Sequence, residues 1–298
     1  MSVFCSTIIP TVNRPTLSRA VRSVLDQDLS AADFEVIVVN DSRAPLPRMD
    51  WQSSPRVRVI DTNGRERCVA RNTGAAVATG EYLHFLDDDD WLLPGALAAF
   101  WDLARTCGRD VVWLHGSYQT VDNDGVVVAE FHPGLNGNVF ALLVAGEGVP
   151  LQVSLVSSRQ FFAVGGFDPR TDVLGVEDRD LGRRLALVGE IAHTPSLVAR
   201  IRIGEVGSTT NWAVLAEGDR RGREKALAAP GAFGRLRASA PSSRLRGRVT
   251  RAYCASAAWN LKRKGLLTAL SRAGCAALCA GPHVVSPGFW RGLRTAIK

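Results

Sequence analysis

The first 110 residues alternate short apolar runs with segments in which apolar residues recur at helical spacing. The apolar runs are residues 5–9, Phe34–Val39, Val57–Ile60 and Tyr82–Leu86. Segments with helical spacing lie between the first two runs and over residues 66–78 and 93–107. Runs of this kind are typical of parallel strands covered on both faces. The alternation therefore predicts an α/β fold built on an open, doubly wound, mostly parallel sheet.

Three of these apolar runs stop abruptly at polar residues. Pro10, Thr11, Asn13 and Arg14 follow the first run, Asn40-Asp41-Ser42 the second, and Asp87–Asp90 the fourth. Ligands of open α/β sheets bind at the carboxyl ends of the strands. The three polar clusters therefore predict a single crevice at one edge of the sheet.

Four adjacent aspartates repel one another and raise each other's pKa values. A bound divalent cation removes this penalty, and the hard ions Mn²⁺ and Mg²⁺ prefer carboxylate, water and phosphate oxygens. The sequence thus favours a metal site at residues 87–90. The alternative is a solvated acidic turn before the next helix, and we expect Asp90 to cap that helix in either case.

Five motifs resemble the inverting family-2 glycosyltransferases of the GT-A fold. They are Ile8-Ile-Pro-Thr11, Val38-Val-Asn-Asp41, Ala70-Arg-Asn-Thr-Gly74, Gly80–Asp90, and Gly165-Gly-Phe-Asp168 with Val176-Glu-Asp-Arg-Asp-Leu181. The resemblance covers residues 5–205 and rests on the order and spacing of the motifs. It implies transfer of a sugar from a nucleotide-diphosphate donor, with uridine diphosphate favoured, to an acceptor hydroxyl of a glycan or of a lipid-linked acceptor.

The resemblance also implies roles for particular residues. Asp89 would ligate the metal, and Asp178 would be the general base, with Glu177 as the fallback. Thr11 and Asp41 would hold the base and ribose of the donor, and Arg71 would contact its diphosphate. In all, eight residues would contact the donor: Pro10, Thr11, Asn13, Arg14, Asp41, Arg71, Asp87 and Asp88.

Two features depart from the family pattern. No histidine lies in the segment Arg202–Ser208, so the third protein ligand of the metal stays open, with Glu205 as a candidate. The Q-x-x-R-W motif of processive polysaccharide synthases is also missing, and no stretch of 18 apolar residues occurs. We therefore expect the transfer of single sugars.

The charge divides the chain at residue 218. Residues 1–218 carry 19 Lys and Arg against 27 Asp and Glu, and residues 219–298 carry 17 against 2. We expect a catalytic domain over 1–218 and a basic helical extension over 219–298, and no nucleic-acid partner, because the body is acidic. Two interpretations of the extension remain: its helices lie on an anionic membrane surface, or they pack on the acidic body. We expect a cytoplasmic protein, peripheral on the inner face of the membrane if the first holds.

Two other functions fit parts of the sequence. A phosphatase of the haloacid-dehalogenase type also has an Asp-x-Asp motif after a strand, but it needs a nucleophilic aspartate after the first strand, where Pro10-Thr11 stands. A degenerate transferase kept as a binding partner is the second alternative. The presence of both Asp89 and Asp178 argues against it.

Overall fold

The computed structural model describes residues 3–29, 33–170, 175–203 and 212–295. A parallel sheet forms its first half, in the order β3-β2-β1-β4. Its strands and the two helices connecting them are β1 (Val3–Thr11), α1 (Leu17–Leu25), β2 (Asp33–Asn40), β3 (Val57–Asp61), α2 (Arg67–Val77) and β4 (Tyr82–Phe85). This half confirms the expected alternation of strands and helices.

The strand register brings polar residues together at the carboxyl edge of this half. Thr11 pairs with Asn40 across β1 and β2, and Asn40 pairs with Asp61 across β2 and β3. Helix α2 approaches the sheet closely at Gly74, where an added Cβ would lie 2.5 Å from Ile8 Cγ2. Close packing at Gly74 thus holds α2 against β1 and β2.

Beyond β4 the sheet is mixed rather than parallel. Its order continues β4-β8-β6-β9-β5, with β8 antiparallel to both β4 and β6, and β7 pairs with β6 in a hairpin. Gly125 in the turn of this hairpin has a φ of +84°. The elements are β5 (Trp91–Leu92), α3 (Ala96–Thr106), β6 (Val111–Val121), β7 (Val127–Phe131), α4 (Phe140–Val144), β8 (Ser154–Ser157), α5 (Ser158–Ala163), α6 (Glu177–Val188) and β9 (Glu190–Arg202), with short 3₁₀ turns at Asp50–Ser53 and Leu151–Val153.

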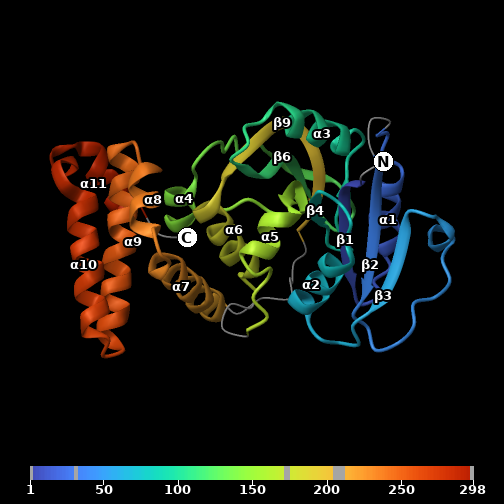
Figure 1. Cartoon of the computed structure of the whole chain (residues 1–298), viewed down its shortest axis with the longest axis horizontal. Helices are drawn as coiled ribbons and strands as arrows, with labels where there is room; N and C mark the ends of the chain where they lie inside the picture. Colours follow the sequence, from blue (N-terminus) through green and yellow to red (C-terminus); the bar gives the residue numbers. More distant parts are fainter. Residues whose placement is uncertain (1–2, 30–32, 171–174, 204–211, 296–298) are drawn as a thin grey trace.

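The rest of the described chain is helical and forms one end of the molecule (Figure 1). It comprises α7 (Trp212–Ala228), α8 (Ala232–Ala238), α9 (Ser243–Lys262), α10 (Leu266–Ala280), the 3₁₀ turn Gly281–Val285 and α11 (Pro287–Arg294). The boundary expected between residues 218 and 219 falls inside α7. None of the described helices is long and apolar enough to cross a membrane.

The apolar residues of the extension divide into two groups. Leu245, Val249 and Tyr253 on α9 belong to the continuous core of the protein. Leu267 and Leu270 on α10, in contrast, are 84% and 61% exposed. Both interpretations of the extension therefore keep support: α9 packs on the body, and α10 presents an uncovered apolar face.

Candidate functional site

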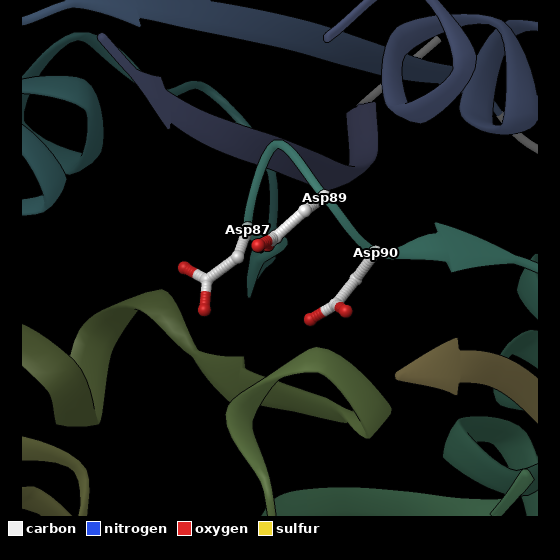
Figure 2. A group of neighbouring side chains, drawn as sticks. All are labelled: Asp87, Asp89 and Asp90. Carbon is white, nitrogen blue, oxygen red and sulfur yellow. The ribbon is translucent and has the colours of Figure 1, made fainter. Parts of the chain in front are cut away.

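Three of the four consecutive aspartates converge at the end of β4. Asp87–Asp90 form a tight turn, in which Asp90 N donates a hydrogen bond to Asp87 O at 3.1 Å. The carboxylates of Asp87, Asp89 and Asp90 lie on the same side of this turn (Figure 2), with one oxygen of each within 4.8 Å of the others. Asp90 also accepts a hydrogen bond from Arg202 N at 2.7 Å. The expectation that Asp90 caps the next helix is wrong, because β5 follows it and Gly95 precedes α3.

The fourth aspartate, Asp88, turns away from this cluster. It is buried, and it accepts hydrogen bonds from Thr11 Oγ1 at 2.5 Å and from Arg14 Nη1 at 3.0 Å. Arg14 Nη1 also lies 2.9 Å from Asp89 Oδ2. Asp88 therefore fastens the end of β1 to the turn, and Arg14 supplies positive charge at the rim of the cluster.

The electrostatics of the acidic turn suit a divalent cation. Burial raises the pKa values of Asp89 and Asp90 above the ordinary range, and the charge of Asp87 raises both further. Three converging carboxylates offer only hard oxygen ligands, which Mg²⁺ and Mn²⁺ prefer. Asp87, Asp89 and Asp90 thus fit such an ion, which would relieve their mutual repulsion.

Arg71 on α2 connects the acidic turn to the start of α6. Its Nη2 donates to Asp87 Oδ1 at 2.7 Å and its Nη1 to Glu177 Oε1 at 3.1 Å. Arg71 is buried, yet the charges of Asp87 and Glu177 outweigh burial and raise the pKa of its guanidinium. Burial alone would raise the pKa of Asp87, but the charge and hydrogen bond of Arg71 leave it below its ordinary value. The pair therefore stays ionised.

The two acids that open α6 lie in different surroundings. Glu177 is buried, and it also accepts a hydrogen bond from Gly175 N at 2.6 Å and lies 3.7 Å from Arg67 Nη1. Asp178 is half-buried, accepts a hydrogen bond from the backbone of Arg179 at 2.7 Å, and lines a cavity of about 1080 Å³. Burial and the charge of Glu177 raise the pKa of Asp178. Asp178 is therefore better placed than Glu177 to accept a proton.

The remaining predicted donor residues lie along the same edge of the sheet. Pro10 and Thr11 end β1, Asn13 follows with a φ of 68°, and Asn13 N donates to Thr11 Oγ1 at 2.9 Å. Asp41 accepts hydrogen bonds from Thr62 Oγ1, Arg65 N and Glu66 N, all between 2.7 and 3.0 Å. In this structure Asp41 thus shapes the loop that leads into α2.

The sequence analysis missed Gln152. Its Nε2 donates to Asp87 Oδ2 at 2.9 Å, and its backbone oxygen lies 3.0 Å from the ring of the buried His84. Burial lowers the pKa of His84 to about 4, so the ring is neutral at pH 7. Gln152 stands alone in a 3₁₀ turn with no motif around it. Glu205, the candidate third metal ligand, lies outside the described residues.

Residues 6–139 match the family model for glycosyl transferase family 2. A poly(ribitol-phosphate) β-N-acetylglucosaminyltransferase of Staphylococcus aureus, TarP, is 31% identical over 113 residues, which are 36% of this chain and 35% of that protein. A GalNAc(5)-diNAcBac-PP-undecaprenol β-1,3-glucosyltransferase of Campylobacter jejuni is 34% identical over 107 residues, 34% of each chain. The matched part thus spans about a third of these relatives.

The fold matches solved structures over a longer stretch. Residues 1–349 of S. aureus TarS, in complex with UDP-GlcNAc, superpose with a TM-score of 0.64 and 14% identity, covering 91% of each chain. The fold is therefore the α/β GT-A fold with a C-terminal helical extension, and residues 6–139 within it are similar to glycosyl transferase family 2.

Proposed function

We propose that the protein transfers a single sugar from a nucleotide-diphosphate donor to an acceptor hydroxyl, with inversion at the anomeric carbon. The observation that carries this proposal is the separation of the two acids at the start of α6. Glu177 is tied through Arg71 to the acidic turn, whereas Asp178 faces a cavity. Inversion needs a base on the face of the sugar opposite the leaving group, and Asp178 would be that base.

In this mechanism each residue has a defined task. Asp178 accepts the proton of the acceptor hydroxyl as its oxygen attacks the anomeric carbon, and the nucleoside diphosphate leaves with the electrons of the broken bond. Arg71 keeps Asp87 ionised and oriented at the donor side. Asp87, Asp89 and Asp90 would hold Mn²⁺ or Mg²⁺, which neutralises charge that grows on a departing diphosphate.

The comparisons support a uridine diphosphate sugar as the donor and a glycan or lipid-linked acceptor. TarS, whose fold this chain shares, has been solved with UDP-GlcNAc. The names of the two relatives describe acceptors that carry phosphate, one a polyol phosphate and the other an undecaprenyl diphosphate. Synthesis of cell-envelope polysaccharides or other glycoconjugates is the role that these acceptors suggest.

A thermal-shift titration with UDP-sugars, with and without Mn²⁺, tests the proposal. A ligand at a hundredfold excess over its Kd stabilises the folded state by about 2.7 kcal/mol. We expect a Mn²⁺-dependent shift in the wild type and in Asp102→Ala, a control that removes an exposed carboxylate on α3, and none in Asp89→Ala. A Mn²⁺-dependent shift in Asp89→Ala would show that Asp89 is not a ligand. Release of UDP from the donor distinguishes an enzyme from a degenerate binding partner.

We also propose that the exposed face of α10 lies on an anionic membrane surface. Between Gly265 and Trp290 the sequence has one charged side chain, Arg272, which is buried and faces inward to Leu227 O and Glu224. Six large apolar side chains in this segment are exposed, with only the uncharged Thr268 and Ser271 as exposed polar side chains of α10 among them: Leu266, Leu267, Leu270, Leu278, Val285 and Trp290. Exposed Lys262, Arg263 and Lys264 stand directly before this face, and no acidic residue follows Glu224 in the sequence.

This charge pattern favours lipid over other partners, because each basic residue near an anionic leaflet contributes about 1 kcal/mol. Sedimentation with anionic liposomes tests the proposal. We expect binding at low salt that is weakened by high salt and lost in Leu267→Ser/Leu270→Ser, which changes only exposed residues. If wild type and variant stay in the supernatant alike, the membrane proposal fails, and self-association measured by light scattering would instead assign the face to a second copy.

A further inference from the structure

A cavity of about 1080 Å³ lies between α7 and α9, beside the start of α6. Small residues on α9 leave this space open: Ala252, Ala255, Ser256 and Ala258. Trp259 lines the cavity as well, with the guanidinium of Arg263 3.9 Å from its ring centroid. Among the aspartates and glutamates of the candidate site, Asp178 alone lines it within the described part of the chain.

Basic residues outnumber acidic ones in the lining, six to four. The three acids contributed by α7 already have protein partners. Glu217 binds Arg221 and Arg263, and Glu224 binds Asn260 from α9 and lies near Arg272. Asp219 is bound by arginines, as described next. The carboxylates are therefore engaged within the protein, and the lining keeps an excess of positive charge.

The excess is most marked at Asp219. Arg183 donates to Asp219 Oδ1 at 2.7 Å and Arg223 binds its other oxygen, and all three side chains are more than nine-tenths buried. Two buried guanidiniums thus share one carboxylate. Burial lowers the pKa of Arg223 to about 10 in spite of Asp219. Arg223 Nε and the buried Ser256 Oγ, both on residues that line the cavity, have no hydrogen-bond partner among the described residues.

A phosphate-bearing ligand would fit the charge, the unpaired donors and the size of this cavity. Uncompensated buried charge and unpaired buried donors are both costly, and an anion relieves the two together. Phosphate oxygens accept bidentate hydrogen bonds from guanidinium groups. The volume exceeds what one phosphate needs and is slightly above the upper end, about 1,000 Å³, of the usual range for sites that hold whole organic ligands. Trp259 adds an apolar ring against which a sugar can pack.

We propose that this cavity is the acceptor site and that it binds an acceptor through a phosphate carried next to the reacting sugar. The proposal rests on the proposed function, because it takes Asp178 as the base. Arg223, Ser256 and Lys262 would hold the phosphate, and the sugar hydroxyl would reach Asp178 at the α6 end of the cavity. The acceptor would then approach from the α7–α9 side, while the donor is held on the Arg71 side of α6.

Titration of the full-length protein with inorganic pyrophosphate, followed by calorimetry and by tryptophan fluorescence, tests the site without a sugar donor. We expect saturable binding that weakens about tenfold or more in Arg223→Gln, as loss of a charge-assisted hydrogen bond predicts. Lys262→Gln, which changes an exposed side chain and is safe for folding, should also weaken binding. Arg237→Gln is the matched control: it removes one exposed charge outside the cavity and should leave the affinity unchanged.

Equal affinities in Lys262→Gln, Arg237→Gln and the wild type, or no saturable binding, would overturn the proposal. Donor binding and UDP release, measured in parallel, keep its failure separate from failure of the proposed function. Pyrophosphate binding without donor binding would overturn the assignment to an acceptor.

Competition against pyrophosphate identifies the source of the phosphate. One arm uses a soluble polyol-phosphate oligomer and the other a polyprenyl-diphosphate sugar in detergent micelles. Displacement of pyrophosphate by either compound supports the proposal and identifies the acceptor class. Displacement by neither would show that the cavity is a site for small anions, not for an acceptor.

Discussion

Replacement of Asp178 by asparagine tests the central assignment of the mechanism. Asparagine has almost the same shape, but it cannot accept the proton of the acceptor hydroxyl. Glu177 cannot substitute, because Arg71 Nη1 at 3.1 Å and Gly175 N at 2.6 Å already engage its carboxylate. The variant should therefore lose the whole contribution of a general base, about 10²–10⁴-fold in kcat. This corresponds to about 3–5 kcal/mol of transition-state stabilisation.

The matched variant Glu177→Gln should behave differently. It leaves Arg71 with one carboxylate instead of two, so donor affinity and stability should fall while the pH dependence of transfer stays. In Asp178→Asn the donor affinity should stay and the pH dependence should vanish. In the wild type, transfer should decline tenfold per pH unit below the pKa of Asp178, which burial and Glu177 raise above the ordinary aspartate value.

Stability gives a second readout for Asp178. Because its folded-state pKa is raised, the folded protein holds the proton more tightly than the unfolded chain, and stability falls as pH rises through that window. Asp178→Asn removes this penalty, so its melting temperature should exceed that of the wild type at pH 7, and the difference should shrink in acid. A variant with near-wild-type turnover, or one that is less stable at pH 7, would refute the assignment of Asp178 as a base with a raised pKa.

Two further predictions concern buried groups. Arg71→Met leaves Asp87 and Glu177 without their shared cation, which should cost about 3–5 kcal/mol in urea unfolding; an unchanged midpoint would show that the bridge is not formed. Burial lowers the pKa of His84 to about 4, so the wild type should gain stability as pH rises from about 4 to 6.5. His84→Gln should flatten that part of the stability profile. A profile identical to that of the wild type would assign the gain in stability to other groups.

The first half of the sheet could be predicted because its signals are local. Each apolar run ends within two residues of the end of β1, β2 or β4, and parallel pairing must bring those ends to one edge. The mixed second half was less visible, because β8 joins the sheet in the antiparallel sense, between β4 and β6, and a short apolar run does not reveal its direction.

The choice among the four aspartates could not be made from the sequence. A run of identical residues gives no sign of which side chains converge, and that is set by the turn. Because Asp90 N bonds to Asp87 O, the first and last residues of the turn face the same side, and Asp88 is carried toward Thr11 and Arg14. The partners of Asp87 were equally hidden, since Gln152 is 65 residues away and joins the site only through the fold.

The acids at the start of α6 are close in sequence but point to different neighbours. Successive residues of an α-helix point about 100° apart, so adjacent acids cannot serve the same neighbour. Glu177 meets Arg71 and Asp178 meets the cavity, while Asp180, about 200° beyond Asp178, turns to Arg184 and Lys225. The helix N-terminus favours all three negative charges, so three acids can be held within one turn. In the proposed mechanism, the 100° step that separates Glu177 from Asp178 would therefore place the base on the acceptor side of α6 and the Arg71-bound acid on its donor side.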